Sequence, residues 1–211
     1  MHVGRIGRMT RAMSHAALAL AMVMGLAAHG QAQDHDGHGF GATAGPQKAA
    51  PLTSQQNDLV KAVQDATRRF RNVTDPSQLG DQYVHLFGCV SGGDFGAMGL
   101  HFVRGDILHD GDVNPNEPEI LLFEPTRNGG IKITGADFIV FKSEWEAKHK
   151  DGSVPSLHGQ LFHLFDAPNR FGLDPFYTLH VWAWKDNPVG TFTNWNPNVS
   201  CDTFNPRTPD E

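Results

Sequence analysis

Residues 177–184, Tyr177-Thr178-Leu179-His180-Val181-Trp182-Ala183-Trp184, carry the clearest structural signal of the chain. In a β-strand successive side chains point to opposite faces, so residues two apart share a face. Leu179, Val181 and Ala183 then form one apolar face with the composition of an ordinary core. The stretch therefore predicts a β-strand that is buried on this side.

The opposite face of this predicted strand carries His180, Trp182 and Trp184. An imidazole flanked by two indoles is unusual on a simply solvated face, and it fits a pocket in which aromatic rings surround one polar group. We therefore predict Trp182, Trp184 and the preceding Tyr177 as ligand-binding residues. Two plainer interpretations stay open: indoles stacked on a half-buried outer face, or a second core face under a helix.

The rest of the folded region shows further strand patterns and one long helix. Apolar residues recur at helical spacing over 54–71, after a capping-box pattern formed by Thr53 and Gln56. The expected strands cover residues 99–103, 119–123, 131–141, 158–165 and 177–184, and a short helix covers 143–149. The expected fold class is α+β, mainly antiparallel β, as a small barrel or a curved sheet with one N-terminal amphipathic helix.

Histidines and carboxylates on these strands suggest a metal site. Imidazoles from neighbouring strands can bind a transition metal, here copper or zinc, and we predict His101 and His180 as ligands. His158, Glu119 and Glu124 are the candidates for the remaining positions. The alternative is that the histidines are hydrogen-bonded structural residues, because the folded region contains no H-x-H or H-E-x-x-H spacing.

The acidic loop at residues 109–119 supports a weaker prediction. Asp110, Asp112, Asn114 and Asn116 offer oxygen ligands at alternate positions, as in a calcium loop. Calcium is the less favoured ion, because Pro115 stands where an EF-hand has its glycine. The same residue types also make a plain loop.

Three classes of function remain compatible with these residues. The first is metal-assisted chemistry on a small ligand in a His/Trp-lined pocket. The second is a non-catalytic module in which the indoles stack on a sugar or aromatic ring. The third is a structural or partner-binding envelope protein.

The N-terminal segment has the composition of a secretory signal peptide. Three arginines precede an apolar run over residues 16–28, which is too short to span a bilayer, and small residues follow up to Ala32. We predict a periplasmic or secreted protein. The expected divisions are a signal peptide at 1–32, a flexible leader at 33–52 and one globular domain at 53–211.

Charge limits the expected partners. The chain has 17 basic and 23 acidic residues, and removal of the three signal-peptide arginines leaves 14 against 23, a net charge of −9. Such an acidic protein is a poor candidate for binding nucleic acid. No other apolar run is long enough to span a membrane. A small-molecule ligand is a possible partner, because the predicted His/Trp-lined pocket could bind one.

Cys89 and Cys201 are the two cysteines of the chain. In an oxidising compartment an isolated pair is most simply a disulfide, which here would close a loop of 112 residues. Two metal-binding thiolates are the disfavoured alternative, because neither cysteine belongs to a C-x-x-C pair.

Several pieces of sequence occur together in a recognisable pattern. They are Met98-Gly99-Leu100-His101, the PEILLFE segment at 118–124 and the LHVWAW segment at 179–184. In these pieces the chain resembles a group of uncharacterised small exported bacterial proteins. The resemblance covers about residues 80–201 and implies that this stretch is the working domain, without implying an activity.

Overall fold

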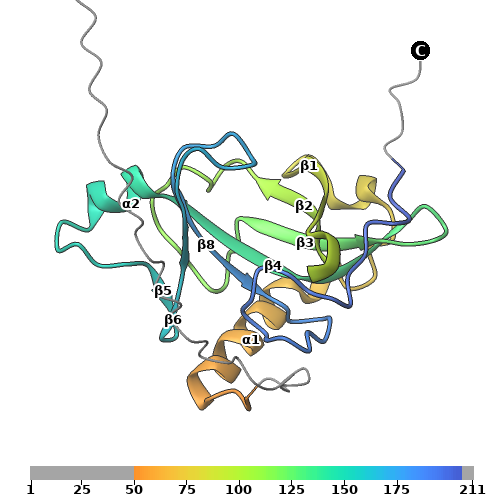
Figure 1. Cartoon of the computed structure of the whole chain (residues 1–211), viewed down its shortest axis with the longest axis horizontal. Coiled ribbons are helices and arrows are strands. Elements are labelled where there is room, and N and C mark those ends of the chain that lie inside the picture. Colours follow the sequence, from red (N-terminus) through yellow and green to blue (C-terminus); the bar gives the residue numbers. More distant parts are fainter. Residues whose placement is uncertain (1–49, 206–211) are drawn as a thin grey trace, which may run out of the picture. The chain divides into compact units, whose positions relative to one another are not determined.

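The computed structural model describes residues 50–205, and Figure 1 shows their arrangement. The predicted signal peptide and nearly all of the predicted leader lie outside the described residues. Within the described part, every helix is too short or too polar to cross a membrane.

The fold is α+β and is dominated by one antiparallel sheet (Figure 1). Six strands pair in the order β1-β2-β3-β4-β8-β7. β1 and β7 form the two edges and do not pair with each other, so the sheet is open. Of the two predicted alternatives, a small barrel or a curved sheet, the barrel is therefore wrong. The strands are β1 Tyr83–Ser91, β2 Ala97–Arg104, β3 Ile120–Pro125, β4 Ile131–Phe141, β8 Phe176–Val181 and β7 His163–Phe165.

Short elements complete the described chain. β5 (Ser156–Leu157) and β6 (Gln160–Leu161) form a separate two-stranded hairpin. The second α-helix, α2 (Lys142–Lys148), follows β4 directly and confirms the short helix expected there. Three 3-10 helices occupy Arg68–Phe70, Pro76–Leu79 and Gly93–Phe95.

The first helix, α1 (Ser54–Thr67), begins with the predicted capping box. The Gln56 N–H donates to Thr53 Oγ1 at 3.2 Å, and the Thr53 N–H donates to Gln56 Oε1 at 2.9 Å. Each bond satisfies a backbone donor that the first helical turn cannot pair. Leu59 and Val63 on the inner side of α1 are fully buried, which confirms the amphipathic helix.

Both faces of the central strands are buried, by different parts of the chain. α1 packs on one face, here called the helix face, against Phe138 of β4 and Leu179 of β8. The opposite face, here called the loop face, packs against the loop at residues 165–173 and the C-terminal segment around Val199. The loop face therefore lies under irregular segments, which leaves space for a site.

The last strand is shorter than expected. β8 ends at Val181, and the Ala183 N–H then donates to the Val181 carbonyl at 2.8 Å. This turn breaks the alternation of side chains, so Trp182 packs on the loop face while Trp184 packs toward α1. The expectation that Trp184 shares a face with His180 and Trp182 is wrong for this reason.

Two other segments differ from the expected strands. The stretch predicted as one strand at 158–165 is divided between β6 and β7, and His158 adopts a φ of 49° in the turn that precedes β6. β1 was not predicted, because most of its residues are exposed or half-buried and show no clear alternation.

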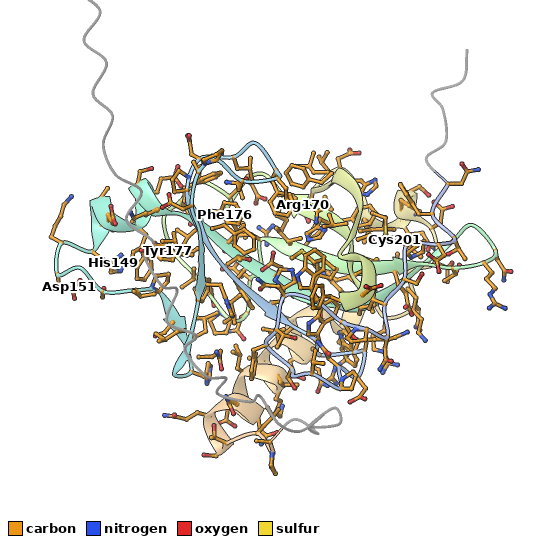
Figure 2. All side chains as sticks on the ribbon, viewed as in Figure 1. His149, Asp151, Arg170, Phe176, Tyr177 and Cys201 are labelled. Carbon is orange, nitrogen blue, oxygen red and sulfur yellow. A yellow bond between two sulfur atoms is a disulfide. The ribbon has the colours of Figure 1, made fainter. Side chains whose placement is uncertain are left out.

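The cysteine pair forms the predicted disulfide. Cys89 of β1 is bonded across 112 residues of chain to Cys201 of the C-terminal segment. Cys201 is labelled in Figure 2. The bond attaches the last described segment to the edge strand of the sheet. A disulfide is typical of proteins that function in an oxidising environment.

Candidate metal centre

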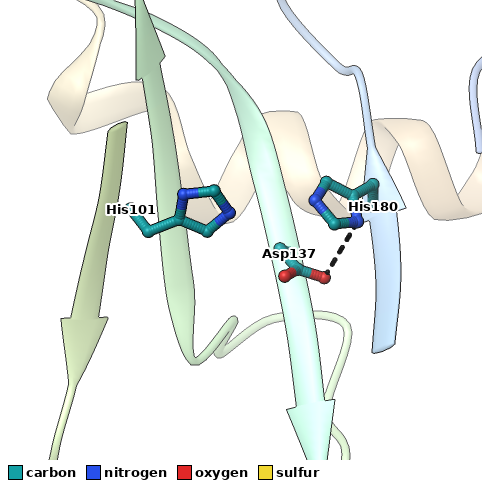
Figure 3. Close-up of side chains that lie close together, drawn as sticks. All are labelled: His101, Asp137 and His180. Atoms are coloured by element: carbon teal, nitrogen blue, oxygen red, sulfur yellow. Dashed lines mark ion pairs between the residues drawn. The ribbon is translucent and has the colours of Figure 1, made fainter. Parts of the chain in front are cut away.

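Three polar side chains meet on the loop face of the sheet (Figure 3). They are His101 of β2, Asp137 of β4 and His180 of β8, and each side chain is at most 5 % exposed. Asp137 and His180 are direct partners in the β4–β8 register, which brings their side chains together. One ligand atom of each residue lies within 4.8 Å of the other two, so the group could hold a metal ion.

A backbone carbonyl orients the His101 ring. His101 Nδ1 lies 3.2 Å from the Gly99 carbonyl oxygen. A carbonyl only accepts hydrogen bonds, so Nδ1 carries the proton and donates it. Nε2 then keeps its lone pair, which is the arrangement that a metal-binding histidine commonly has.

His180 is the least satisfied polar residue of the group. It is 2 % exposed, and neither ring nitrogen has a hydrogen-bond partner among residues 50–205. Nδ1 lies 3.4 Å from Asp137 Oδ1, an ion-pair distance without hydrogen-bond geometry. Leaving a buried polar group without a partner costs about 1–3 kcal/mol. The ring is thus held at a cost that coordination to a cation would offset.

Asp137 is the one carboxylate in the lining of this buried site. The Thr178 hydroxyl donates to Oδ1 at 2.5 Å and fixes the orientation of the carboxylate. No Lys or Arg side chain lines the pocket around Asp137. A buried carboxylate without a cation is unfavourable, and this favours a positive ion beside it.

The titration of the three residues suits metal binding. Burial lowers the pKa of His101 to about 4 and that of His180 to about 3, because apolar surroundings disfavour the imidazolium. Burial raises the pKa of Asp137 to about 6. At neutral pH the imidazoles are neutral and the carboxylate is ionised, and these are the protonation states that bind metals.

A small pocket adjoins the three residues. It has a volume of about 30 Å³, and its polar lining consists of His101, Asp137, His180 and Thr178. Apolar side chains make up the rest of its wall: Phe87, Met98, Ile120, Ile139, Phe165, Phe171, Leu173 and Phe176. The polar group therefore lies at one side of a phenylalanine-rich pocket.

The structure brings two of the five predicted metal ligands together. His101 and His180 belong to the group, whereas Glu119, Glu124 and His158 lie elsewhere. Both Glu124 oxygens contact the Lys185 ammonium, at 2.8 and 3.0 Å. His158 is exposed in the turn between β5 and β6.

Two structural features keep His158 and Glu119 apart from the group. The strand expected at 158–165 is broken, which removes His158 from the sheet. Glu119 is buried, but its Oε2 accepts the Ile139 N–H at 3.1 Å, so the carboxyl serves the β4 backbone.

Asp137 was missed, although the sequence carries a signal for it. It lies inside the apolar run Ala136-Asp137-Phe138-Ile139-Val140, within a strand that was correctly predicted. Acidic residues are almost never fully buried without a partner. A single carboxylate in such a run therefore indicates a site, whereas the two glutamates were favoured only because they bracket a strand.

The three predicted ligand-binding aromatic residues are not assembled into one surface. The Trp182 indole is buried on the loop face and donates to the Thr193 carbonyl at 2.7 Å. The Trp184 indole donates to Thr67 Oγ1 at 2.9 Å and lies under the Arg71 guanidinium. Tyr177 is buried on the helix face. The three aromatic side chains therefore do not form one surface on which a sugar or aromatic ring could stack, and their binding of such a ligand stays a prediction.

The acidic loop uses its oxygens internally. Asp110 Oδ1 accepts the Asp112 N–H, Asn114 Oδ1 accepts the Asn116 N–H, and Asp112 pairs with Lys148 at 2.5 Å. Among residues 50–205, His101, Asp137 and His180 form the one group of three metal-ligating residues of the His, Cys, Asp and Glu types. The loop thus offers no comparable carboxylate group for calcium.

The burial of Glu119 leads to a prediction about pH. Burial raises the pKa of this carboxyl to about 8 from an ordinary value of 4.5. Between these values the folded state retains a proton that the unfolded state has lost. The free energy of unfolding therefore falls as pH rises, by about 1.4 kcal/mol per pH unit from this group.

The Glu119→Gln variant should lose this dependence. We expect its advantage in stability over the wild type to grow between pH 4.5 and 8 and then to level off, as measured by urea unfolding at several pH values. Glu117→Gln, which changes a neighbouring exposed carboxylate, is the matched control and should follow the wild type. Parallel curves for Glu119→Gln and wild type would contradict the assignment.

Comparisons with protein-family models, curated protein sequences and solved structures give no match to this chain.

Proposed function

We propose that this protein binds one divalent transition-metal ion through His101, Asp137 and His180, and that the bound ion acts on a small ligand in the adjoining pocket. The observation that carries the proposal is the buried His180 ring, whose two nitrogens lack hydrogen bonds while a carboxylate and a second imidazole lie beside it. A cation at this point would be a partner for the imidazole lone pairs and would balance the charge of Asp137.

The ligand types indicate which ions fit. Two imidazole nitrogens and one carboxylate oxygen make a set used for zinc, with a fourth position left to water or substrate. The same set with open positions is used by iron(II) in enzymes that react with oxygen. Calcium prefers oxygen ligands throughout and does not suit two imidazoles. Zinc and iron(II) are therefore favoured, and copper, which often adopts a tetragonal geometry, is third.

The surroundings supply the remaining requirements of a metal centre. Thr178 orients Asp137 and the Gly99 carbonyl orients His101, so two of the three ligands are fixed by second hydrogen bonds. A bound ion polarises a ligand or lowers the pKa of a bound water. The N-terminal sequence indicates export, which agrees with the disulfide. Because both cysteines are bonded to each other, histidines and carboxylates are the side chains left to bind a metal.

Metal content of the purified full-length chain tests the proposal. We expect about one ion per chain in the wild type, measured by elemental analysis after dialysis. His101→Ala, His180→Ala and Asp137→Asn should each weaken binding by more than about 100-fold, because loss of a second-shell partner alone costs 10–100-fold. Asp137→Asn keeps an acceptor for the Thr178 hydroxyl, so its fold should be preserved.

His158→Ala is the matched control, because this exposed histidine lies outside the group. It should bind metal like the wild type. A wild-type protein that takes up none of zinc, iron(II) or copper, and whose unfolding temperature does not rise with added ion, would exclude the proposal.

A further inference from the structure

Two phenylalanine rings from different segments meet in the wall of the pocket beside the candidate metal ligands. Phe87 lies in β1 and Phe171 in the loop at residues 165–173, and their ring centroids are 5.4 Å apart. Phe87 is 45 % exposed, whereas the side chains deeper in the pocket, such as Phe176 and Ile139, are buried. This pair of rings, here called the phenylalanine gate, thus lies toward the exposed side of the pocket, whereas His101, Asp137 and His180 are at most 5 % exposed.

The chain holds both sides of the gate in place. Phe87 has a φ of 66°, an unusual conformation for a bulky residue, at a bulge between Leu86 and Cys89. Cys89 is bonded to Cys201, which fixes the strand next to the bulge. A bulge beside a site commonly serves to aim a side chain, and here it directs Phe87 into the pocket wall.

The loop that carries Phe171 is attached on its other side. The Asn169 side chain accepts the Phe171 N–H at 3.1 Å, which shapes the loop. Arg170, labelled in Figure 2, donates to the Ser91 carbonyl at 3.1 Å and so joins the loop to the end of β1. The Arg170 guanidinium also lies 5.8 Å from the Trp195 ring centroid. These contacts keep Phe171 beside Phe87.

The size of the pocket limits what can enter. A volume of about 30 Å³ has room for about two or three water molecules, since one water needs about 10–15 Å³ of such space. A ring or a sugar does not fit while the gate is closed. The ligand at the metal is therefore of the size of water or a diatomic molecule.

The lining offers little to hold a larger polar ligand. Apart from the three candidate metal ligands and Thr178, every lining residue is apolar. The one arginine of the covering loop is engaged with Ser91 and Trp195. A ligand in this pocket would therefore be held mainly by the ion itself, whose charge exceeds that of the single carboxylate.

From these observations we infer that the phenylalanine gate restricts the metal to ligands of one or two heavy atoms, such as water, hydroxide, dioxygen or nitric oxide. This inference rests on the proposed metal site and adds the ligand class and the residues that select it. Phe87 and Phe171 are specificity-determining residues that act by excluding larger molecules.

Ligands of graded size test the inference on the metal-loaded full chain. The iron(II) form under anaerobic conditions should bind nitric oxide, which is seen in its absorption and electron paramagnetic resonance spectra. The cobalt(II) form should show no change in its visible spectrum with imidazole, a neutral ligand of five heavy atoms. In the cobalt(II) form of Phe171→Ala, imidazole should bind with a Kd at least about 10-fold lower than in the wild type. A steric difference of even one methylene group changes affinity by about 10-fold or more, and this variant removes a whole ring.

Phe87→Ala provides a second variant on the other side of the gate, so that a folding defect in one does not decide the result. Phe95→Ala is the matched control, because this phenylalanine is 70 % exposed and does not line the pocket. It should exclude imidazole like the wild type.

The outcomes separate this inference from the proposed function. Equal imidazole binding by wild type and both gate variants, with metal retained, would overturn the gate while the metal site stands. Failure of nitric oxide and imidazole to bind any metal-loaded form would show a fully coordinated ion and also overturn it. Failure of the wild type to take up iron(II) or cobalt(II) would overturn both.

Discussion

Removal of the Cys89–Cys201 disulfide is expected to lower the free energy of unfolding by about 4–5 kcal/mol. The bond closes a loop of 112 residues, and in the chain-entropy model a loop of about 100 residues contributes about 4.7 kcal/mol by restricting the unfolded chain. This is an upper value, because the unfolded chain retains some structure. Urea unfolding of the Cys89→Ser/Cys201→Ser double variant measures the loss.

Reduced wild-type protein is the control for this experiment, and it should unfold at the same urea concentration as the double variant. We also expect the double variant to admit imidazole to the metal, because Cys89 adjoins the bulge that carries Phe87. A double variant as stable as the oxidised wild type would contradict the prediction.

The second large effect is expected for Gly99→Ala. Gly99 has a φ of 90°, and a Cβ built there would lie 2.3 Å from the Phe123 carbonyl oxygen of the adjacent strand β3. Left-handed backbone costs a residue with a side chain about 1–2 kcal/mol, and overpacking costs about 1–3 kcal/mol more. The variant should therefore lose about 2–5 kcal/mol of stability.

Gly99→Ala should also weaken metal binding, because the Gly99 carbonyl accepts the Nδ1–H of His101. Gly105→Ala is the matched control, since a Cβ at that position meets nothing within 4 Å and its φ is not positive. Its stability should stay within about 0.5 kcal/mol of the wild type. If Gly99→Ala kept both stability and metal affinity, the close contact of β2 with β3 would be refuted.

The sequence predicted correctly those helices and strands that are marked by short-range patterns, such as a capping box or a run of apolar residues. The capping box at Thr53 and the apolar spacing that includes Leu59 and Val63 predicted α1, and the structure confirms both. Strands buried on both faces, such as β4, were found because their residues are apolar over a long run. β1 was missed because an edge strand with many exposed residues has no such pattern.

The candidate metal centre was only half visible before folding. His101 and His180 could be selected because imidazoles are uncommon within apolar strands. The periodicity of the sequence could not favour Asp137 over Glu119 and Glu124 as the third ligand. The third ligand has to come from a strand beside His180, and only the pairing of β4 with β8 places Asp137 there. The direction of Trp184 likewise depended on where β8 ends, which is decided by backbone hydrogen bonds beyond Val181.

By itself, the sequence determined the fold class, the capped helix, the disulfide pair and two of the three candidate metal ligands, because these follow from residue type and short-range spacing. Only the tertiary structure decided that the sheet is open, that Asp137 joins His101 and His180, and that Phe87 and Phe171 meet in the wall of the pocket. The side-chain contacts join residues far apart in the sequence: His101 and Asp137 are 36 positions apart, Asp137 and His180 are 43 apart, and Phe87 and Phe171 are 84 apart. Strand order and register, not local propensity, determine which of these residues meet.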